Sequence, residues 1–186
     1  KIIKTAWDYD HADFTAIVIT IVLTLALGVE IGVMSGVSAS VSLHLYRTMR
    51  PHFAIVGTVP GTEHYRNIDR HKVLTHHNIL SIRIDESLYF ANAAFLEEIV
   101  DTELSQRDGI EHVILMCPAV NMIDLSAVEA LQEVNSRLLE RGVKLHLSEV
   151  KGPVMDALKR SALLLQLSGN VYLSHHAAVL ELTQKS

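Results

Sequence analysis

The chain has 186 residues, of which 49% are hydrophobic and 20% are charged, and its formal net charge is −5. This length allows one domain of about 100–150 residues plus an appendage, and the acidic balance argues against a partner nucleic acid. The single cysteine, Cys117, excludes an internal disulfide and is typical of a reducing compartment.

An apolar stretch runs from Phe14 to Tyr46, and its only charged residue is Glu30. As one helix it would be about 50 Å long, too long for one membrane span of about 30 Å and too short for two complete spans with a loop. Because glycines lie near its middle, we expect two short helices, over about residues 14–28 and 31–46, that form a hairpin in the membrane. One tilted anchoring helix is the alternative. Residues 1–46 are thus predicted to be one or two transmembrane segments.

Small residues recur at every fourth position of this stretch, at Gly28, Gly32 and Gly36. This spacing predicts a stripe that lets two helices pack closely, and short helices at membrane depth need such contacts with other protein. Glu30 is an acid at membrane depth, which makes it a candidate functional residue. The alternative is that Glu30 caps or pairs at the break between the two helices.

Basic residues follow the apolar stretch directly, at Arg47, Arg50 and His52. Positive charge next to a membrane segment indicates the cytoplasmic side. We therefore expect the remainder of the chain to lie in the cytoplasm. A cleavable signal peptide is disfavoured because the apolar stretch is too long.

The remainder reads as a junction with a first strand, residues 47–78, followed by an α/β domain, residues 79–186. Apolar patterns typical of strands alternate with patterns typical of helices. Strands are expected around 80–84, 113–116, 143–147 and 171–173, and helices around 95–104, 128–141, 153–168 and 175–184. This order predicts a mostly parallel sheet covered by helices.

Several motifs carry a family resemblance. Residues 50–52, 56–62 and 65–66 look like the junction of SulP-type anion transporters. Leu88-Tyr89-Phe90-Ala91-Asn92-Ala93 is similar to the most recognisable motif of their cytoplasmic domain. Asp124-Leu125-Ser126, ahead of a helix, resembles the central motif of STAS domains (sulphate transporter and anti-sigma-factor antagonist). The resemblance covers about residues 8–183.

The resemblance implies the last transmembrane helices and the cytoplasmic STAS domain of a secondary active anion transporter of the sulfate, bicarbonate or dicarboxylate class. It also implies an upstream transporter domain with the substrate site, contact with membrane lipid, a homodimer in the cell (inner) membrane, and a cytoplasmic protein or a nucleotide as partner of the STAS domain. The alternative is a STAS binding switch of the anti-sigma-factor-antagonist type, controlled by Ser126 phosphorylation or by a nucleotide.

Ser126 matches the hydroxyl that is phosphorylated in soluble STAS regulators, although Leu125 and Ala127 depart from their pattern. A phosphate would add about −1.5 to −2 charges at a helix start, where the helix dipole favours negative charge. The alternative, which we favour, is a Ser-x-x-Glu capping box of Ser126 with Glu129. Asp124 is expected to be a further acceptor at the helix start.

No catalytic constellation is evident, so we expect no enzyme activity. The sequence lacks a Gly-x-Ser-x-Gly motif and a Walker phosphate loop. Adjacent histidines at 76–77 and 175–176 would face opposite ways on a strand, and no His-x-x-x-His pair occurs. We therefore predict neither a metal nor a cofactor. Cys117 ends an apolar strand and is expected to be a buried small hydrophobe.

Overall fold

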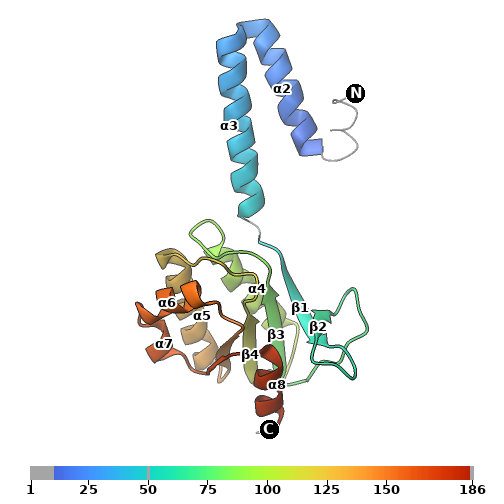
Figure 1. The fold of residues 1–186 in the computed structure, drawn as a ribbon, viewed down its shortest axis with the longest axis vertical. Coiled ribbons are helices and arrows are strands. Elements are labelled where there is room, and N and C mark those ends of the chain that lie inside the picture. The colour runs from blue at the N-terminus through green and yellow to red at the C-terminus, as the bar shows by residue number, and fades with distance from the viewer. Residues whose placement is uncertain (1–10, 50, 185–186) are drawn as a thin grey trace. The chain divides into compact units, whose positions relative to one another are not determined.

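The structure is a computed structural model that describes residues 11–49 and 51–184. The chain divides into two compact units, Lys1–Arg50 and Pro51–Ser186. The first unit is a helical hairpin in which α2 (His11–Leu27) and α3 (Val29–Thr48) lie side by side in opposite directions (Figure 1). Two helices are thus present where the sequence predicts two.

Gly28 forms the turn between these helices. Its φ of 95° lies in the left-handed region, which glycine adopts without the steric cost that a Cβ would bring. The turn is closed by a hydrogen bond from Gly28 N–H to the carbonyl of Thr24, with an N···O distance of 3.1 Å. Within the described residues, no helix combines the length and the apolar character that crossing a membrane demands.

The second unit is built on a six-stranded sheet with the strand order β2-β1-β3-β4-β5-β6. Strand β1 pairs antiparallel with β2 and with β3, whereas β3, β4, β5 and β6 are parallel. The predicted mostly parallel sheet is therefore confirmed. The strands are β1 (Phe53–Thr58), β2 (Tyr65–Asn67), β3 (Ile79–Ile84), β4 (His112–Met116), β5 (Lys144–Ser148) and β6 (Val171–Tyr172).

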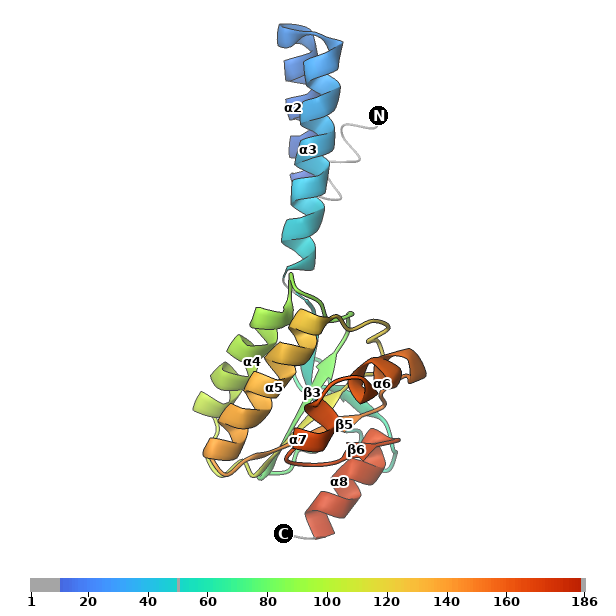
Figure 2. The ribbon, with the colours of Figure 1, turned by 90° about the vertical axis from the view of Figure 1, so that its left-hand side faces the viewer.

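Helices cover both faces of this sheet. One face packs against α4 (Ala93–Ser105), α5 (Leu125–Glu140), α6 (Gly152–Lys159) and α7 (Leu163–Gln166), and the other packs against α8 (His175–Gln184). Figure 2 shows α4 and α5 lying side by side along their face. Strands contribute alternate residues to the two cores because successive side chains point to opposite faces.

One expected helix is interrupted. The sequence predicts a single helix over about residues 153–168, but α6 and α7 are separate. Ser161 lies at the break, where its hydroxyl donates to the carbonyl of Leu158 at 2.7 Å and accepts from the N–H of Leu163 at 3.2 Å. Serine side chains that bond to nearby backbone groups compete in this way with helical hydrogen bonds.

Candidate functional site

The family motifs meet at the carboxyl edge of the sheet, beyond the ends of β3 and β4. Leu88 N–H donates to the carbonyl of Met122 at 3.1 Å, and Asp124 N–H donates to the carbonyl of Leu88 at 3.3 Å. These bonds form a short parallel bridge between Leu88 and Ile123. The Leu88–Ala93 motif and the Asp124–Ser126 motif therefore form one structure. In open α/β sheets this edge is the usual place for ligands and partners.

Asp124 holds the site together. Its Oδ1 accepts from the N–H of Ala127 at 2.9 Å, which caps α5, and its Oδ2 accepts from the N–H of Phe90 at 2.9 Å, which fixes the neighbouring loop. One carboxylate thus satisfies a free N–H of the first helical turn and ties the two motifs to each other.

Ser126 does not cap the helix. It is the second residue of α5 and is exposed, because α5 begins at Leu125 and the capping position belongs to Asp124. The predicted capping box of Ser126 with Glu129 is therefore wrong, and the helix starts two residues earlier than that box requires. The extended backbone of Asp124, with φ −99° and ψ 178°, is the conformation of a capping residue.

Two polar side chains, one buried and one partly buried, shape the Leu88–Ala93 loop. Asn92 is fully buried; its Oδ1 accepts from the N–H of Tyr89 and its Nδ2 donates to the carbonyl of Ser87, both at 2.9 Å. The hydroxyl of Ser87 accepts from the N–H groups of Asn121 and Met122 at 3.3 and 3.2 Å. The sequence motif includes Asn92, but Ser87 is found only through its contacts with a segment more than 30 residues away.

Three large apolar side chains are exposed on these linked loops and helix start: Phe90 at 70%, Met122 at 56% and Leu125 at 71%. Together with Ser126 they form what we call the carboxyl-edge surface. Contiguous exposed apolar patches mark interaction sites, whereas apolar side chains scattered singly are normal; these three lie on segments that hydrogen bonds join to each other. The backbone beneath them is fixed by Asp124 and Asn92, so the surface is presented on a rigid support.

The other reactive or charged side chains near this edge have structural roles. Cys117 is buried, as predicted, and burial together with the negative charge of Glu149 raises its thiol pKa to about 12, so it is no nucleophile at neutral pH. The guanidinium of Arg83 binds Asp85 through Nε at 2.6 Å, and this hydrogen bond raises the Arg83 pKa. Among residues 11–49 and 51–184, no three His, Cys, Asp or Glu side chains gather as a metal ion would require.

The glycine stripe divides into two roles. A Cβ added to Gly32 would lie 2.7 Å from the Cα of Thr24, and one added to Gly36 would lie 2.5 Å from the hydroxyl of Thr20. These glycines therefore allow α2 and α3 to approach closely. Gly28 does not: a Cβ there would meet nothing within 4 Å, and its part is the turn.

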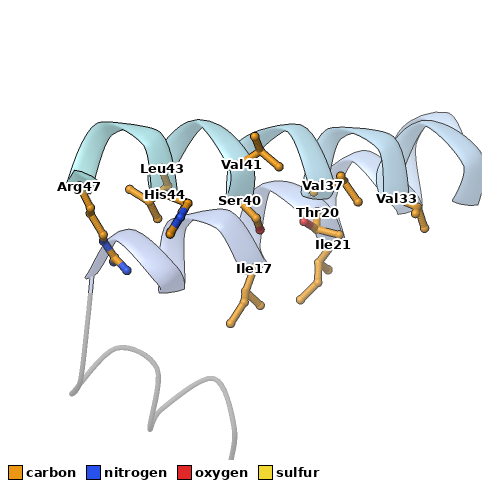
Figure 3. A pocket seen from close by; sticks show the side chains of 11 residues that line it. Ile17, Thr20, Ile21, Val33, Val37, Ser40, Val41, Leu43, His44 and Arg47 are labelled. Atoms are coloured by element: carbon orange, nitrogen blue, oxygen red, sulfur yellow. The ribbon is translucent and has the colours of Figure 1, made fainter. Parts of the chain in front are cut away.

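An apolar groove of about 770 Å³ lies between α2 and α3. Figure 3 shows Ile17, Ile21 and Val37 along it, with His44 and Arg47 toward one end. Glu30 is not part of the groove. It is exposed in the first turn of α3, where the helix dipole favours a carboxylate, and no side chain caps that turn.

A protein-family model and a curated relative both match this chain. The protein-family model described as "STAS domain" matches residues 71–178. The chain is 34% identical over 168 residues to "Probable sulfate transporter 4.2" of Arabidopsis thaliana, an alignment that covers 84% of this chain and 25% of that protein. The chain thus spans about a quarter of the length of this curated relative.

Two solved structures are similar in fold. The murine Solute Carrier 26 family member A9 (Slc26a9) anion transporter, in the inward-facing state, matches 98% of this chain and 30% of its own, with a TM-score of 0.86 and 20% identity. The STAS domain of a SulP transporter from Vibrio cholerae matches 64% of this chain and 94% of its own, with a TM-score of 0.50 and 18% identity.

Proposed function

Because the chain belongs to the STAS domain family, we propose that it is the C-terminal part of a secondary active anion transporter. Its second unit is then the regulatory and assembly domain of that transporter. The identity to a sulfate transporter carries the proposal: the alignment takes in 84% of the chain, more than the unit Pro51–Ser186 alone provides. The match therefore extends into the helical hairpin.

The hairpin is placed in the membrane under this proposal. Its outer side chains are apolar and exposed, including Val22, Leu25 and Met34, so they need a covering of lipid or protein. Short helices are stable at membrane depth when they pack against other helices, which an upstream transporter domain would supply. Positive charge at the end of α3 and just beyond it, at Arg47 and Arg50, supports a cytoplasmic location of the STAS domain. A homodimer is part of the same proposal.

The substrate path is assigned to the upstream transporter domain. Among the described residues of the hairpin, acidic and basic residues occur at Glu30, near the turn, and at His11, Asp13, His44 and Arg47, near the opposite end. A binding site for a sulfate, bicarbonate or dicarboxylate anion takes several donors at one place, and under this proposal the upstream transporter domain supplies them.

Anion flux into proteoliposomes tests this assignment. The whole transporter that contains this chain is expected to move labelled sulfate, bicarbonate or a dicarboxylate, and the 186-residue chain reconstituted alone is expected to move none. Flux by the chain alone would place the substrate path here, and a whole transporter that moves none of the three anions would contradict the proposed class.

A second function, a phosphorylation-controlled binding switch, is favoured by one observation. Ser126 is exposed and Asp124 already caps α5. The Ser126 hydroxyl is therefore not needed as the helix cap. A phosphate there would meet the positive end of the helix dipole, although the carboxylate of Asp124 would oppose it. Opposite transport rates for Ser126→Ala and Ser126→Asp at equal melting temperature would support the switch, whereas equal rates would exclude it.

A further inference from the structure

The face of the sheet beneath α8 contains buried polar side chains, in contrast to the opposite face. On β3, β4 and β5 the residues facing α4 and α5 are apolar. The positions between them, which face α8, include Ser81, His112, His146 and Ser148. Helix α8 adds a further histidine, His175, that is fully buried. With His176, the next residue of α8, four imidazoles therefore lie under or within this helix.

His175 joins the start of α8 to two strands. Its Nδ1 lies 2.9 Å from the hydroxyl of Ser148 on β5, and its Nε2 lies 3.0 Å from the hydroxyl of Ser81 on β3. The ring of Tyr65 packs edge-on against the imidazole, with 4.4 Å between ring centroids. One neutral imidazole thus satisfies both serines and anchors the N-terminal end of α8.

Two further histidines, His146 and His112, lie under the other end of α8. The N–H of Asn170 donates to Nδ1 of His146 at 3.0 Å, so this nitrogen carries no proton and the neutral ring carries it on Nε2. That Nε2 lies 3.1 Å from Nδ1 of His112, which must therefore accept the bond. A proton added to either accepting nitrogen would face an N–H group and break the chain.

This pair lines a polar cavity together with the end of α8. The cavity has a volume of about 580 Å³, and Glu181 and Leu182 of α8 form part of its wall. Its opening gives solvent protons a route to His112, which is only partly buried. Glu181 and Leu182 of α8 therefore share a cavity with a hydrogen-bond chain that requires both imidazoles to be neutral.

We propose that α8 is a pH-sensitive cover of the sheet, docked while His112, His146 and His175 are neutral and released when they take up protons. Release would uncover the apolar residues beneath it, which include Ile114 and Met116 of β4. The helix is suited to local opening, because its buried side chains are only His175, Ala178, Val179 and Leu182.

The surrounding charges do not compensate a proton on His175. Within the described structure both its ring nitrogens bond to serine hydroxyls, and the carboxylate of Glu149 accepts from the backbone N–H of His175 at 3.4 Å, not from the ring. The neighbouring His176 adds like charge, and Tyr65 is a neutral phenol whose pKa burial raises further. Burial and His176 together lower the His175 pKa to about 4.

The charges around the other pair are mixed. Burial lowers the His112 pKa, Glu111 raises it in part, and Lys144 lowers it. Glu181 of α8 lines the same cavity. Burial is the largest cause of the lowered pKa at both His175 and His112. We therefore expect α8 to be fully docked above the ordinary histidine pKa of about 6.5 and to lose stability as the pH falls from there toward 4.

Hydrogen exchange of the 186-residue chain in detergent, at pH 7.5 and pH 5.0 and corrected for intrinsic exchange, tests the proposal. Protection of α8 amides is expected to fall by about tenfold or more at pH 5.0, while α5 amides keep theirs. His175→Gln should greatly reduce this dependence, and His64→Gln, a change at an exposed histidine, should leave it unchanged. Unchanged α8 protection at pH 5.0, or an equal loss in α5, would overturn the proposal.

Wild-type chain labelled with ¹⁵N-histidine gives a second measurement that needs no variant, in case His175→Gln fails to dock α8 at either pH. The proposal expects the His175 imidazole to take up its proton over the same pH range in which α8 loses protection. Proton uptake by His175 with α8 still protected would overturn it.

Discussion

The two faces of the sheet differ in how they are covered, although the same strands form both. The strands of the face under α4 and α5 contribute apolar residues, and α5 alone buries six apolar residues in this core. The face under α8 contains two serines and two histidines, and α8 buries four residues. The first arrangement supports a fixed platform for the carboxyl-edge surface. The second holds a short helix by bonds that depend on protonation.

The largest difference in stability between the two faces is expected from a matched pair of Leu→Ala changes. Leu96 of α4 and Leu182 of α8 are both buried, at 1% and 4% exposure. Leu96→Ala should lower the free energy of unfolding by about 3–5 kcal/mol, because it leaves a cavity in a close-packed apolar core. Leu182→Ala should cost about 2 kcal/mol or less, because Leu182 borders a cavity that is already polar.

Urea denaturation of the chain in detergent measures both values. Equal losses would contradict the difference between the faces.

Lowering the pH is expected to destabilise the packing of α8 against the sheet. His175 has a folded-state pKa of about 4 and an unfolded value of about 6.5, so the unfolded chain binds the proton more tightly. Stability should be constant above about pH 7 and should decline from about pH 6.5 to 4, by about 3 kcal/mol in all. Thermal unfolding across this range checks the sign, and a melting temperature that rises on acidification would contradict it.

Removing a partner of His175 should have a smaller effect. Ser148→Ala leaves the buried Nδ1 of His175 without its hydroxyl partner, and an unsatisfied buried group costs about 1–3 kcal/mol. Ser136→Ala, at an exposed position of α5, is the control and should be close to neutral. The melting temperatures of the two variants make the comparison, and equal values would show that the Ser148 bond contributes nothing.

The smallest effects concern the helix cap. Asp124→Ala should cost about 0.5–2 kcal/mol, because it frees the N–H of Ala127. Ser126→Ala should change stability by no more than about 0.5 kcal/mol, as is usual for an exposed residue. Denaturation of both variants decides which residue is the cap, and a larger loss for Ser126→Ala would restore the capping box.

The elements of the fold could be predicted from the sequence where one face of an element is apolar. The alternation of Leu80, Ile82 and Ile84 predicts β3, and Val143 to Leu147 predicts β5. The same alternation gives no sign that His146 and Ser148, at the polar positions of β5, are buried. Their partners, Asn170 and His175, are distant in sequence, so only the tertiary structure pairs them.

The helix cap shows a similar limit of prediction from local sequence. Asp124 and Ser126 are both capable N-caps, and local sequence favours the serine because Glu129 follows at the right spacing. The choice is made by a long-range contact, since Leu88 accepts from Asp124 N–H and the N–H of Phe90 binds the same carboxylate. A contact across more than 30 residues has no local signal.

The central proposal is that the second unit is the regulatory and assembly domain of an anion transporter, and we expect its carboxyl-edge surface to take part in that regulation. The most direct test is anion flux by the whole transporter with Phe90→Ser and Leu125→Ser combined, against Leu165→Ser, a matched change at an apolar side chain of α7 that is 92% exposed. At equal melting temperature and equal amount in the membrane, we predict a several-fold change in flux for the first and none for the second. Unchanged flux for both would contradict the account.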